Sequence, residues 1–454
     1  AAAMVGVTKS ACAAEFVGTF LLVFTVGCNV LSSNPNWGGL SIACSLMVGI
    51  YALGGVSGAN FNPAVSIALG VAGKMQDGFR QVAVYSAVQI VAGCCAALAY
   101  SLLFGESFHL GPAEGYAWWQ AMLCEMMYTF VLCFVVLNCA ASKKIGGKNQ
   151  FYGLAIGFVI VAGAYGSGAV SGGCFNPAVA IAIDVLSITK GFGWCIIYSV
   201  CEIMGALAAV LLFKLVRPEE SNESDPPETY SIQSKLAAEM IGTFVLVVTV
   251  GMNVLVHSKA AAFSIAASLM VMIYSLGDVS GGHFNPAVTM AILCSGREKI
   301  NLKEACQYMA AQLFAGIYAA FFYEVVQNGK TFPLGPGKGF DWGGVAVAEI
   351  IYTFVLCFVV LCVATVMQNP APQMTGFIIG MCVTVGGLAI GHISGGSLNP
   401  AVSIGVATAR KVIGDGRLQA GFLYSGLELI GALLAAASFS IIHADEYAKD
   451  TSPA

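Results

Sequence analysis

Residues 57–65 read Ser-Gly-Ala-Asn-Phe-Asn-Pro-Ala-Val, and the same pattern returns three more times along the chain. Residues 171–179, 280–288 and 394–402 repeat it, each with Ser-Gly at the start and Asn-Pro-Ala-Val at the end. The distance from the first copy to the third equals the distance from the second copy to the fourth. This spacing indicates that a long unit carrying two copies was duplicated as a whole.

Each copy predicts the start of a short helix. Asn is a favoured N-cap, Pro is favoured at the first helical position, and the glycines before them allow a tight turn. The apolar run after Asn62 lasts about ten residues, or ~15 Å of helix, which is half the thickness of a bilayer core. We therefore predict four half-helices. Their motif residues are Asn62, Pro63, Ala64, Asn176, Pro177, Ala178, Asn285, Pro286, Ala287, Asn399, Pro400 and Ala401.

The composition is that of a membrane protein. Of the 454 residues, 58% are hydrophobic and only 10% are charged, whereas soluble domains carry about 25% charged residues. The net charge of −4 and the lack of a basic cluster argue against nucleic acid as a partner. Twelve apolar runs are long enough to span the bilayer. They cover residues 11–31, 39–57, 80–104, 119–140, 151–169, 191–216, 234–256, 260–279, 302–325, 343–366, 373–392 and 419–442.

The runs form two sets of six around one polar segment, residues 217–234, which holds five acidic residues and three prolines. Within each set the two halves also match, as in Ala-Glu-Phe-Val-Gly-Thr-Phe around Glu15 and Cys-Glu-Met-Met-Tyr-Thr-Phe around Glu125. Three spans per half force the halves into opposite orientations. We predict an all-α polytopic membrane protein with two units, 1–216 and 235–454, and a linker at 217–234. Each unit has six transmembrane helices and two re-entrant half-helices in inverted repeats.

Cytosolic loops of membrane proteins carry an excess of lysine and arginine. In this chain the side of the membrane that holds the N-terminus has more of these residues than the other side. This bias predicts that both termini and the linker lie in the cytosol.

With four paired motifs inside inverted three-helix repeats, the chain resembles the aquaporin (major intrinsic protein) family over almost its whole length. The resemblance implies a passive channel in the lipid bilayer for water and small neutral solutes, with one pore per six-helix unit. Paired half-helices would direct their positive ends and Asn amides at the pore centre, and so exclude cations and protons. Because the family assembles four units, two chains are expected to form a homodimer.

The chain departs from the family pattern at the predicted selectivity filter. The family's filter Arg, three residues after the second motif Asn, is replaced by Val179 in unit 1 and Val402 in unit 2. The other filter positions are Ile42, Ala164 and Gly173 in unit 1, and Ile265, Gly387 and Gly396 in unit 2. Small apolar residues at these positions favour a wide filter that admits neutral solutes larger than water. The alternative is that other side chains narrow or seal the pore.

Four glutamates recur at equivalent places in the half-units, namely Glu15, Glu125, Glu239 and Glu349. Carboxylates inside a membrane are expensive and often functional, so a proton relay is one interpretation. The other is that each accepts hydrogen bonds from a re-entrant loop, whose N–H groups need partners in lipid; Glu202 and Glu428 have the same options. Resemblance places Asn60 and His283 on the cytoplasmic pore wall.

No nucleotide-binding loop, catalytic carboxylate pair or Cys/His cluster occurs in the sequence. We therefore predict no enzymatic activity, no catalytic residues, no cofactor and no metal site. Two other functions stay open beside the channel. One is a non-conducting scaffold subunit with the same fold, and the other is a secondary transporter, which would need a coupling-ion site where the repeats cross.

Overall fold

The computed structural model describes residues 6–222, 224–369, 371–414 and 416–447. The chain divides into two compact units, Ala1–Glu228 and Thr229–Ala454. Twelve helices in the described residues are long and apolar enough to cross a membrane. These residues contain helices but no strands, so the predicted all-α polytopic fold is confirmed.

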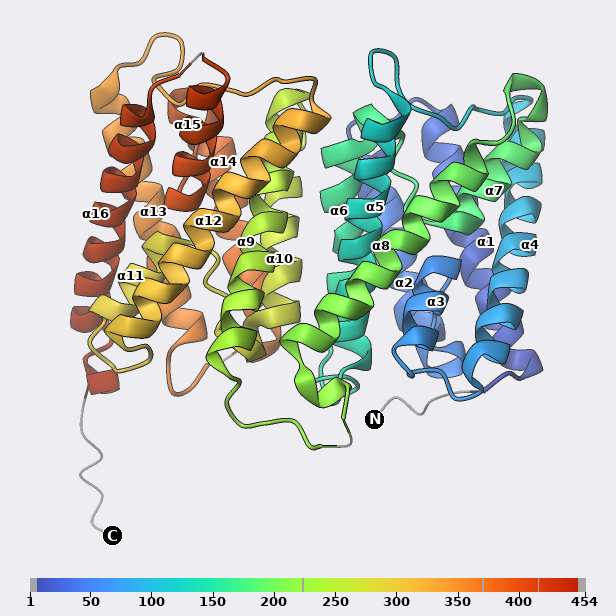
Figure 1. The fold of residues 1–454 in the computed structure, drawn as a ribbon, viewed down its shortest axis with the longest axis horizontal. Helices are drawn as coiled ribbons and strands as arrows, with labels where there is room; N and C mark the ends of the chain where they lie inside the picture. Colours follow the sequence, from blue (N-terminus) through green and yellow to red (C-terminus); the bar gives the residue numbers. More distant parts are fainter. Residues whose placement is uncertain (1–5, 223, 370, 415, 448–454) are drawn as a thin grey trace. The chain divides into compact units, whose positions relative to one another are not determined.

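Unit 1 contains six long helices and two short ones (Figure 1). The long helices are α1 (Lys9–Leu31), α2 (Gly38–Ser57), α4 (Gly78–Phe104), α5 (Trp118–Val135), α6 (Tyr152–Ser171) and α8 (Trp194–Val216). The short helices are α3 (Pro63–Val71) and α7 (Pro177–Leu186). A π-helical turn, Val136–Ala141, continues α5. A single α-helix was expected over this whole stretch, so the change of helix type was not predicted.

Unit 2 repeats this order. Its long helices are α9 (Ile232–Leu255), α10 (Ala261–Ser280), α12 (Leu302–Val326), α13 (Trp342–Ala364), α14 (Thr375–Ser394) and α16 (Leu418–Ile442). Its short helices are α11 (Pro286–Cys294) and α15 (Pro400–Val412). Short 3₁₀ turns cover Ile188–Lys190, Pro218–Glu220, Pro372–Met374 and Ala444–Tyr447.

Within each unit the two short helices come from opposite sides and approach one another through their N-termini (Figure 1). In unit 1, α3 and α7 each pack against both α4 and α8 and also touch one another. In unit 2, α11 and α15 likewise pack against α12 and α16 and touch one another. This is the inverted-repeat architecture, and it brings all four Asn-Pro-Ala motifs into the interior of their own unit.

Glycines allow the helices to cross closely. A Cβ atom on Gly316 of α12 would lie 2.3 Å from the carbonyl oxygen of Ala401 in α15, far inside van der Waals contact. A Cβ atom on Gly205 of α8 would lie 2.3 Å from the carbonyl oxygen of Met126 in α5. Small residues at helix crossings are the usual way in which membrane helices gain close packing. These contacts hold the short helices and the long helices in one framework.

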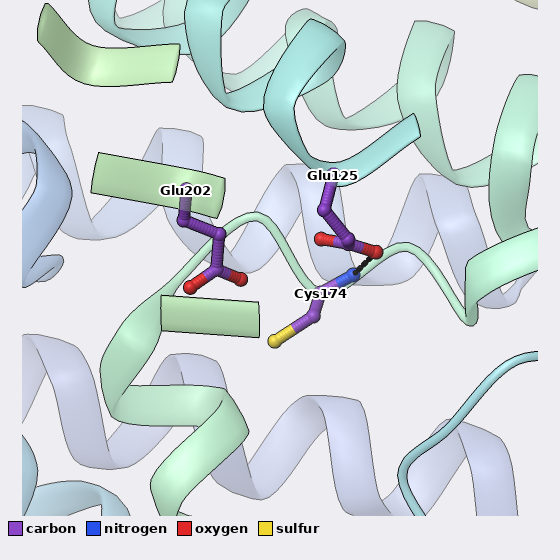
Figure 2. A group of neighbouring side chains, drawn as sticks. All are labelled: Glu125, Cys174 and Glu202. Atoms are coloured by element: carbon purple, nitrogen blue, oxygen red, sulfur yellow. Dashed lines mark hydrogen bonds between the residues drawn. The ribbon is translucent and has the colours of Figure 1, made fainter. Parts of the chain in front are cut away.

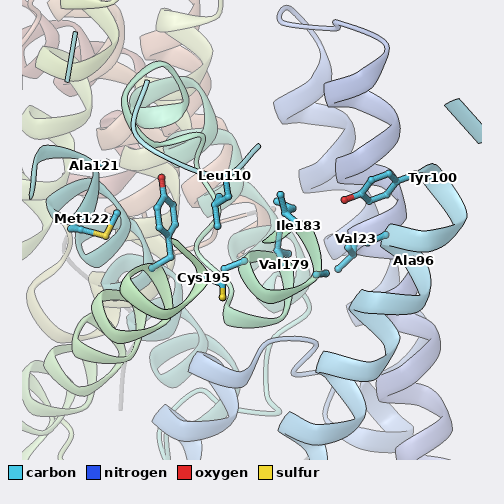
Figure 3. Packing of buried hydrophobic residues seen from close by; sticks show 13 residues of the cluster. Val23, Ala96, Tyr100, Leu110, Ala121, Met122, Val179, Ile183 and Cys195 are labelled. Carbon is cyan, nitrogen blue, oxygen red and sulfur yellow. The ribbon is translucent and has the colours of Figure 1, made fainter. Parts of the chain in front are cut away.

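The core of unit 1 surrounds the second half-helix. Val179 and Ile183 of α7 are buried with Val23 of α1, Ala96 of α4 and Cys195 of α8 in one apolar cluster (Figure 3). Ala121 and Met122 of α5 belong to the same cluster, so four long helices contribute to the packing around α7. A helix this short is only marginally stable by itself, so its packing against the long helices keeps it in place.

The first part of the polar linker belongs structurally to unit 1. The Glu220 carboxylate accepts from the Lys74 ammonium at 2.6 Å and from the Lys143 N–H at 2.7 Å. The Lys143 ammonium also donates to the carbonyl oxygens of Glu219 and Asn222. At its other end, the segment predicted as linker to 234 is already helical from Ile232. The extended connection is thus shorter than predicted from composition.

Candidate functional site

Each Asn-Pro-Ala motif follows a turn made of left-handed residues. Gly58 ends α2 at φ 92°, Ala59 follows at 53°, and Phe61 has φ 51° just before the motif. The other three loops share this pattern, with φ between 50° and 94° at Gly172, Gly173, Phe175, Gly281, Gly282, Phe284, Gly395, Gly396 and Leu398. A non-glycine residue in this region is strained unless its surroundings hold it there. Such strain requires strong partners for the loop backbone.

The asparagines cap their helices and bind one another's loops. The Asn62 side-chain oxygen accepts from the Ala64 N–H at 2.9 Å, while its amide nitrogen donates to the Phe175 carbonyl at 2.8 Å. In return the Asn176 amide donates to the Phe61 carbonyl at 3.0 Å. Unit 2 has the same reciprocal pair, with Asn285 bound to Leu398 and Asn399 bound to Phe284. The N-termini of both half-helices therefore meet at one place in each unit.

Buried glutamates accept the loop N–H groups. Glu15 accepts from the N–H groups of Asn60 and Phe61 at 3.0 and 2.8 Å, and Glu125 accepts from those of Cys174 and Phe175 at 3.0 and 2.7 Å. Glu239 and Glu349 make the equivalent pairs of bonds in unit 2. Hydrogen bonds to a carboxylate are stronger than those between neutral groups. Each glutamate thus accepts two hydrogen bonds from the backbone of the strained turn beside it.

A tyrosine and a glutamine or glutamate, four residues apart on one long helix, form further hydrogen bonds with each loop or with its glutamate. Tyr85 of α4 donates to the Ser57 carbonyl at 3.0 Å, and Gln89, one turn on, donates to Glu15 at 2.7 Å. In the half-units that carry a glutamate instead of this glutamine, Glu202 accepts from the Asn176 N–H at 2.8 Å and Glu428 from the Asn399 N–H at 3.0 Å. The recurrence of this Tyr-x₃-Gln/Glu pattern is visible in the sequence. Its hydrogen-bond partners are visible only in the structure.

The residues at the predicted filter positions differ in exposure, and two of them are neighbours in each unit. Ala164 of α6 and Gly173 are neighbours in unit 1, because a Cβ on Gly173 would lie 3.5 Å from the Ala164 Cα. In unit 2, a Cβ on Gly396 would lie 3.6 Å from the Gly387 Cα. Ile42 on α2 and Ile265 on α10 are half-buried. Val179 and Val402 are each only 3% exposed, and Val179 packs in the apolar cluster of Figure 3.

The two predicted wall residues hold matching places. The Asn60 amide donates to the Ser66 hydroxyl at 3.0 Å, and the His283 Nδ1 lies 3.1 Å from the Thr289 hydroxyl. Asn60 is 5% exposed and His283 is 9% exposed. Each side chain therefore bonds to the first turn of the half-helix that follows it, and the two units differ in chemistry at this contact.

One grouping was not predicted. Glu125, Cys174 and Glu202 come from three separate parts of the sequence, yet their ligand atoms all lie within 4.8 Å of one another (Figure 2). Among the residues that the structure describes, this is the one set of three such side chains close enough to hold a metal ion. No sequence motif predicts this grouping, because the three residues lie on α5, on the second re-entrant loop and on α8.

Comparison with known proteins identifies the fold. The model of the major intrinsic protein family matches residues 4–213, 154–256 and 250–443. Aquaporin NIP2-3 of Zea mays is 31% identical over 229 residues, which cover 48% of this chain and 73% of that protein. Aquaporin NIP6-1 of Arabidopsis thaliana is 30% identical over 242 residues, covering 50% of this chain and 74% of that protein.

Among solved structures, the aquaglyceroporin from Plasmodium falciparum is similar to 48% of this chain and 99% of its own, at 18% identity and a TM-score of 0.43. Each of the two plant aquaporins therefore corresponds to about one half of this chain. The family model, in contrast, covers both halves. The chain belongs to the major intrinsic protein family, whose members are membrane channels for water and small solutes.

Proposed function

We propose that each six-helix unit forms one passive pore for water and small neutral solutes, and that the chain has no enzymatic activity. The observation that carries the proposal is the reciprocal bonding of the two motifs, Asn62 to Phe175 at 2.8 Å and Asn176 to Phe61 at 3.0 Å. It brings two positive helix ends to one point, where they repel cations. A water molecule there meets N–H donors and is reoriented, which interrupts proton transfer along a file.

We further propose that the filter admits neutral solutes larger than water. Ala164, Gly173, Gly387 and Gly396 have little or no side chain, and the family's Arg is replaced by Val179 and Val402. The burial of Val179 in an apolar cluster supports this, because it takes that side chain out of the path. The glutamates serve as loop supports, and both termini and the linker are cytosolic. Two chains are proposed to assemble as a homodimer with four units.

Stopped-flow light scattering on proteoliposomes tests the proposal. Shrinkage under an impermeant osmolyte measures water permeability, urea or glycerol uptake measures solute permeability, and a trapped pH dye measures proton leak. We expect water flux well above that of empty vesicles, uptake of at least one neutral solute, and no added proton leak. Flux equal to that of empty vesicles would favour the scaffold function instead. Saturating flux that depends on an ion gradient would favour the secondary transporter.

A further inference from the structure

The Glu125–Cys174–Glu202 group has the chemistry of a cation site. Figure 2 shows the two carboxylates on either side of the loop that carries the thiol. Glu125 and Glu202 are fully buried, whereas Cys174 is partly exposed. Neither glutamate belongs to an ion pair with a lysine or arginine in the described ranges. Two acidic side chains thus face one thiol without a compensating positive side chain.

Part of this group is free to bind. Both Glu125 oxygens accept loop N–H groups, and Glu202 Oε1 accepts from the Asn176 N–H. Glu202 Oε2, however, has no hydrogen-bond partner although the residue is 0% exposed. A buried carboxylate oxygen without a partner is costly. One carboxylate oxygen of Glu202 lies within 4.8 Å of the Cys174 Sγ and of a Glu125 oxygen. A cation bound among the three side chains would therefore give the Glu202 carboxylate a further partner.

We propose that Glu125, Cys174 and Glu202 bind a borderline-soft divalent cation of the zinc type, and that this cation closes the pore of unit 1. The binding of the cation is argued from the grouping alone, whereas the closure of the pore rests on the proposed function. Thiolate and carboxylate together are zinc ligands, and three protein ligands leave a fourth position for water. Ligand atoms around a tetrahedral zinc are about 3.3–3.8 Å apart, so the side chains need to close by roughly 1 Å.

Binding follows a balanced exchange. The Cys174 thiol now donates to the Asn176 carbonyl at 3.4 Å. When the cation arrives, a sulfur–metal bond replaces the S–H bond and the proton leaves to water. Because Cys174 lies two residues before the motif Asn, a cation held there adds positive charge and bulk beside the meeting point of α3 and α7.

Unit 2 is a natural control for this proposal. It keeps both glutamates, Glu349 and Glu428, but has Ser397 in place of the cysteine. The Ser397 hydroxyl is 2.7 Å from the Ser403 hydroxyl, which in turn donates to Glu428 Oε1 at 2.8 Å. A neutral hydroxyl that is already bonded does not replace a thiolate as a zinc ligand. Unit 2 should therefore not respond to the cation.

The binding test uses the full-length chain in detergent, titrated with Cd²⁺ while the ultraviolet charge-transfer band of the Cd–thiolate bond is recorded. We expect Cys174→Ser to lose one equivalent of tight binding relative to the unsubstituted chain. Ser397→Cys should gain one equivalent. Glu202→Gln should weaken the site at least tenfold, because even the outer hydrogen-bond partners of a metal site are worth about 10–100-fold in affinity. Titrations that are identical with and without Cys174 would overturn the site. Loss in Cys174→Ser with unchanged affinity in Glu202→Gln would show a lone thiol and also overturn it.

The flux test uses proteoliposomes with and without Zn²⁺. Zinc should reduce the water permeability of the unsubstituted chain by about half, leave that of Cys174→Ser unchanged, and nearly abolish that of Ser397→Cys, if each unit carries one pore. A conducting chain that binds Cd²⁺ at Cys174 but keeps its full flux in zinc would overturn the closure. If no variant conducts without zinc, the proposed function fails, and the Cd²⁺ titration still decides whether the site exists.

Discussion

At the residue scale, the first re-entrant loop differs from the other three at one position, Ala59, and the difference affects stability. The second residue of each re-entrant turn is left-handed, and it is glycine in three loops but Ala59 in the first. A left-handed alanine costs roughly 1–2 kcal/mol relative to a right-handed one. The first loop therefore carries strain that the other three avoid.

Ala59→Gly should stabilise unit 1 by about 1 kcal/mol, because glycine adopts a φ of 53° without strain. The same exchange in the middle of the first half-helix, Ala68→Gly, should destabilise it by about 1 kcal/mol through lost helix propensity. Thermal unfolding of the two variants in detergent measures the difference. If both substitutions shift the midpoint in the same direction, the strain at Ala59 is absent.

Glu15→Gln should destabilise the first loop, because an amide presents only one acceptor to the Asn60 and Phe61 N–H groups. An unsatisfied buried donor costs about 1–3 kcal/mol. Glu114→Gln is the control, since Glu114 is exposed and should leave unfolding unchanged. Proton leak measured on the same Glu15→Gln vesicles separates the two roles of this residue. A loss of proton flux with intact stability would favour the relay.

At the scale of the helices, the sequence predicts where the spanning helices lie but not which loops bind one another. The twelve spans are confirmed because a run of about 20 apolar residues has few alternatives in a membrane. The motif roles stay predictions. Their hydrogen-bond partners, such as Phe175 for Asn62, depend on which loops meet in space, and no local pattern encodes that. For the same reason the composition of 217–234 predicts a linker but not its attachment to Lys74 and Lys143.

The α12–α15 crossing gives a prediction at this scale. Gly316→Ala places a methyl group 2.3 Å from a backbone carbonyl, which cannot move without shifting α15. We expect a loss of about 1–3 kcal/mol, as for other overpacked sites. Gly391→Ala on α14 is the matched control, because its Cβ meets nothing within 4 Å, and it should be neutral or slightly stabilising. Equal effects in both variants would mean that the crossing is looser than described.

For the whole molecule, the central question is whether both units conduct. Ala164→Trp and Gly387→Trp each introduce a large ring at the predicted filter of one unit. If the units are independent pores, each substitution should remove about half of the water permeability and the pair should remove nearly all of it. Ala169→Trp, at an exposed position of α6, controls for the added ring. A single substitution that abolishes all flux would indicate one conducting unit.

The reciprocal bonding of the motifs also imposes an order on biosynthesis. The acceptor for the Asn62 amide is the Phe175 carbonyl, 113 residues later in the chain. When the first half-helix emerges from the ribosome, Glu15 has already emerged, but Tyr85 and Gln89, which lie further along the chain, have not. The insertion machinery must therefore shelter a polar, unfinished loop until five spanning helices of the unit have been delivered. A nascent chain that stalls before α7 would expose that loop to lipid, and we expect quality control to recognise it there.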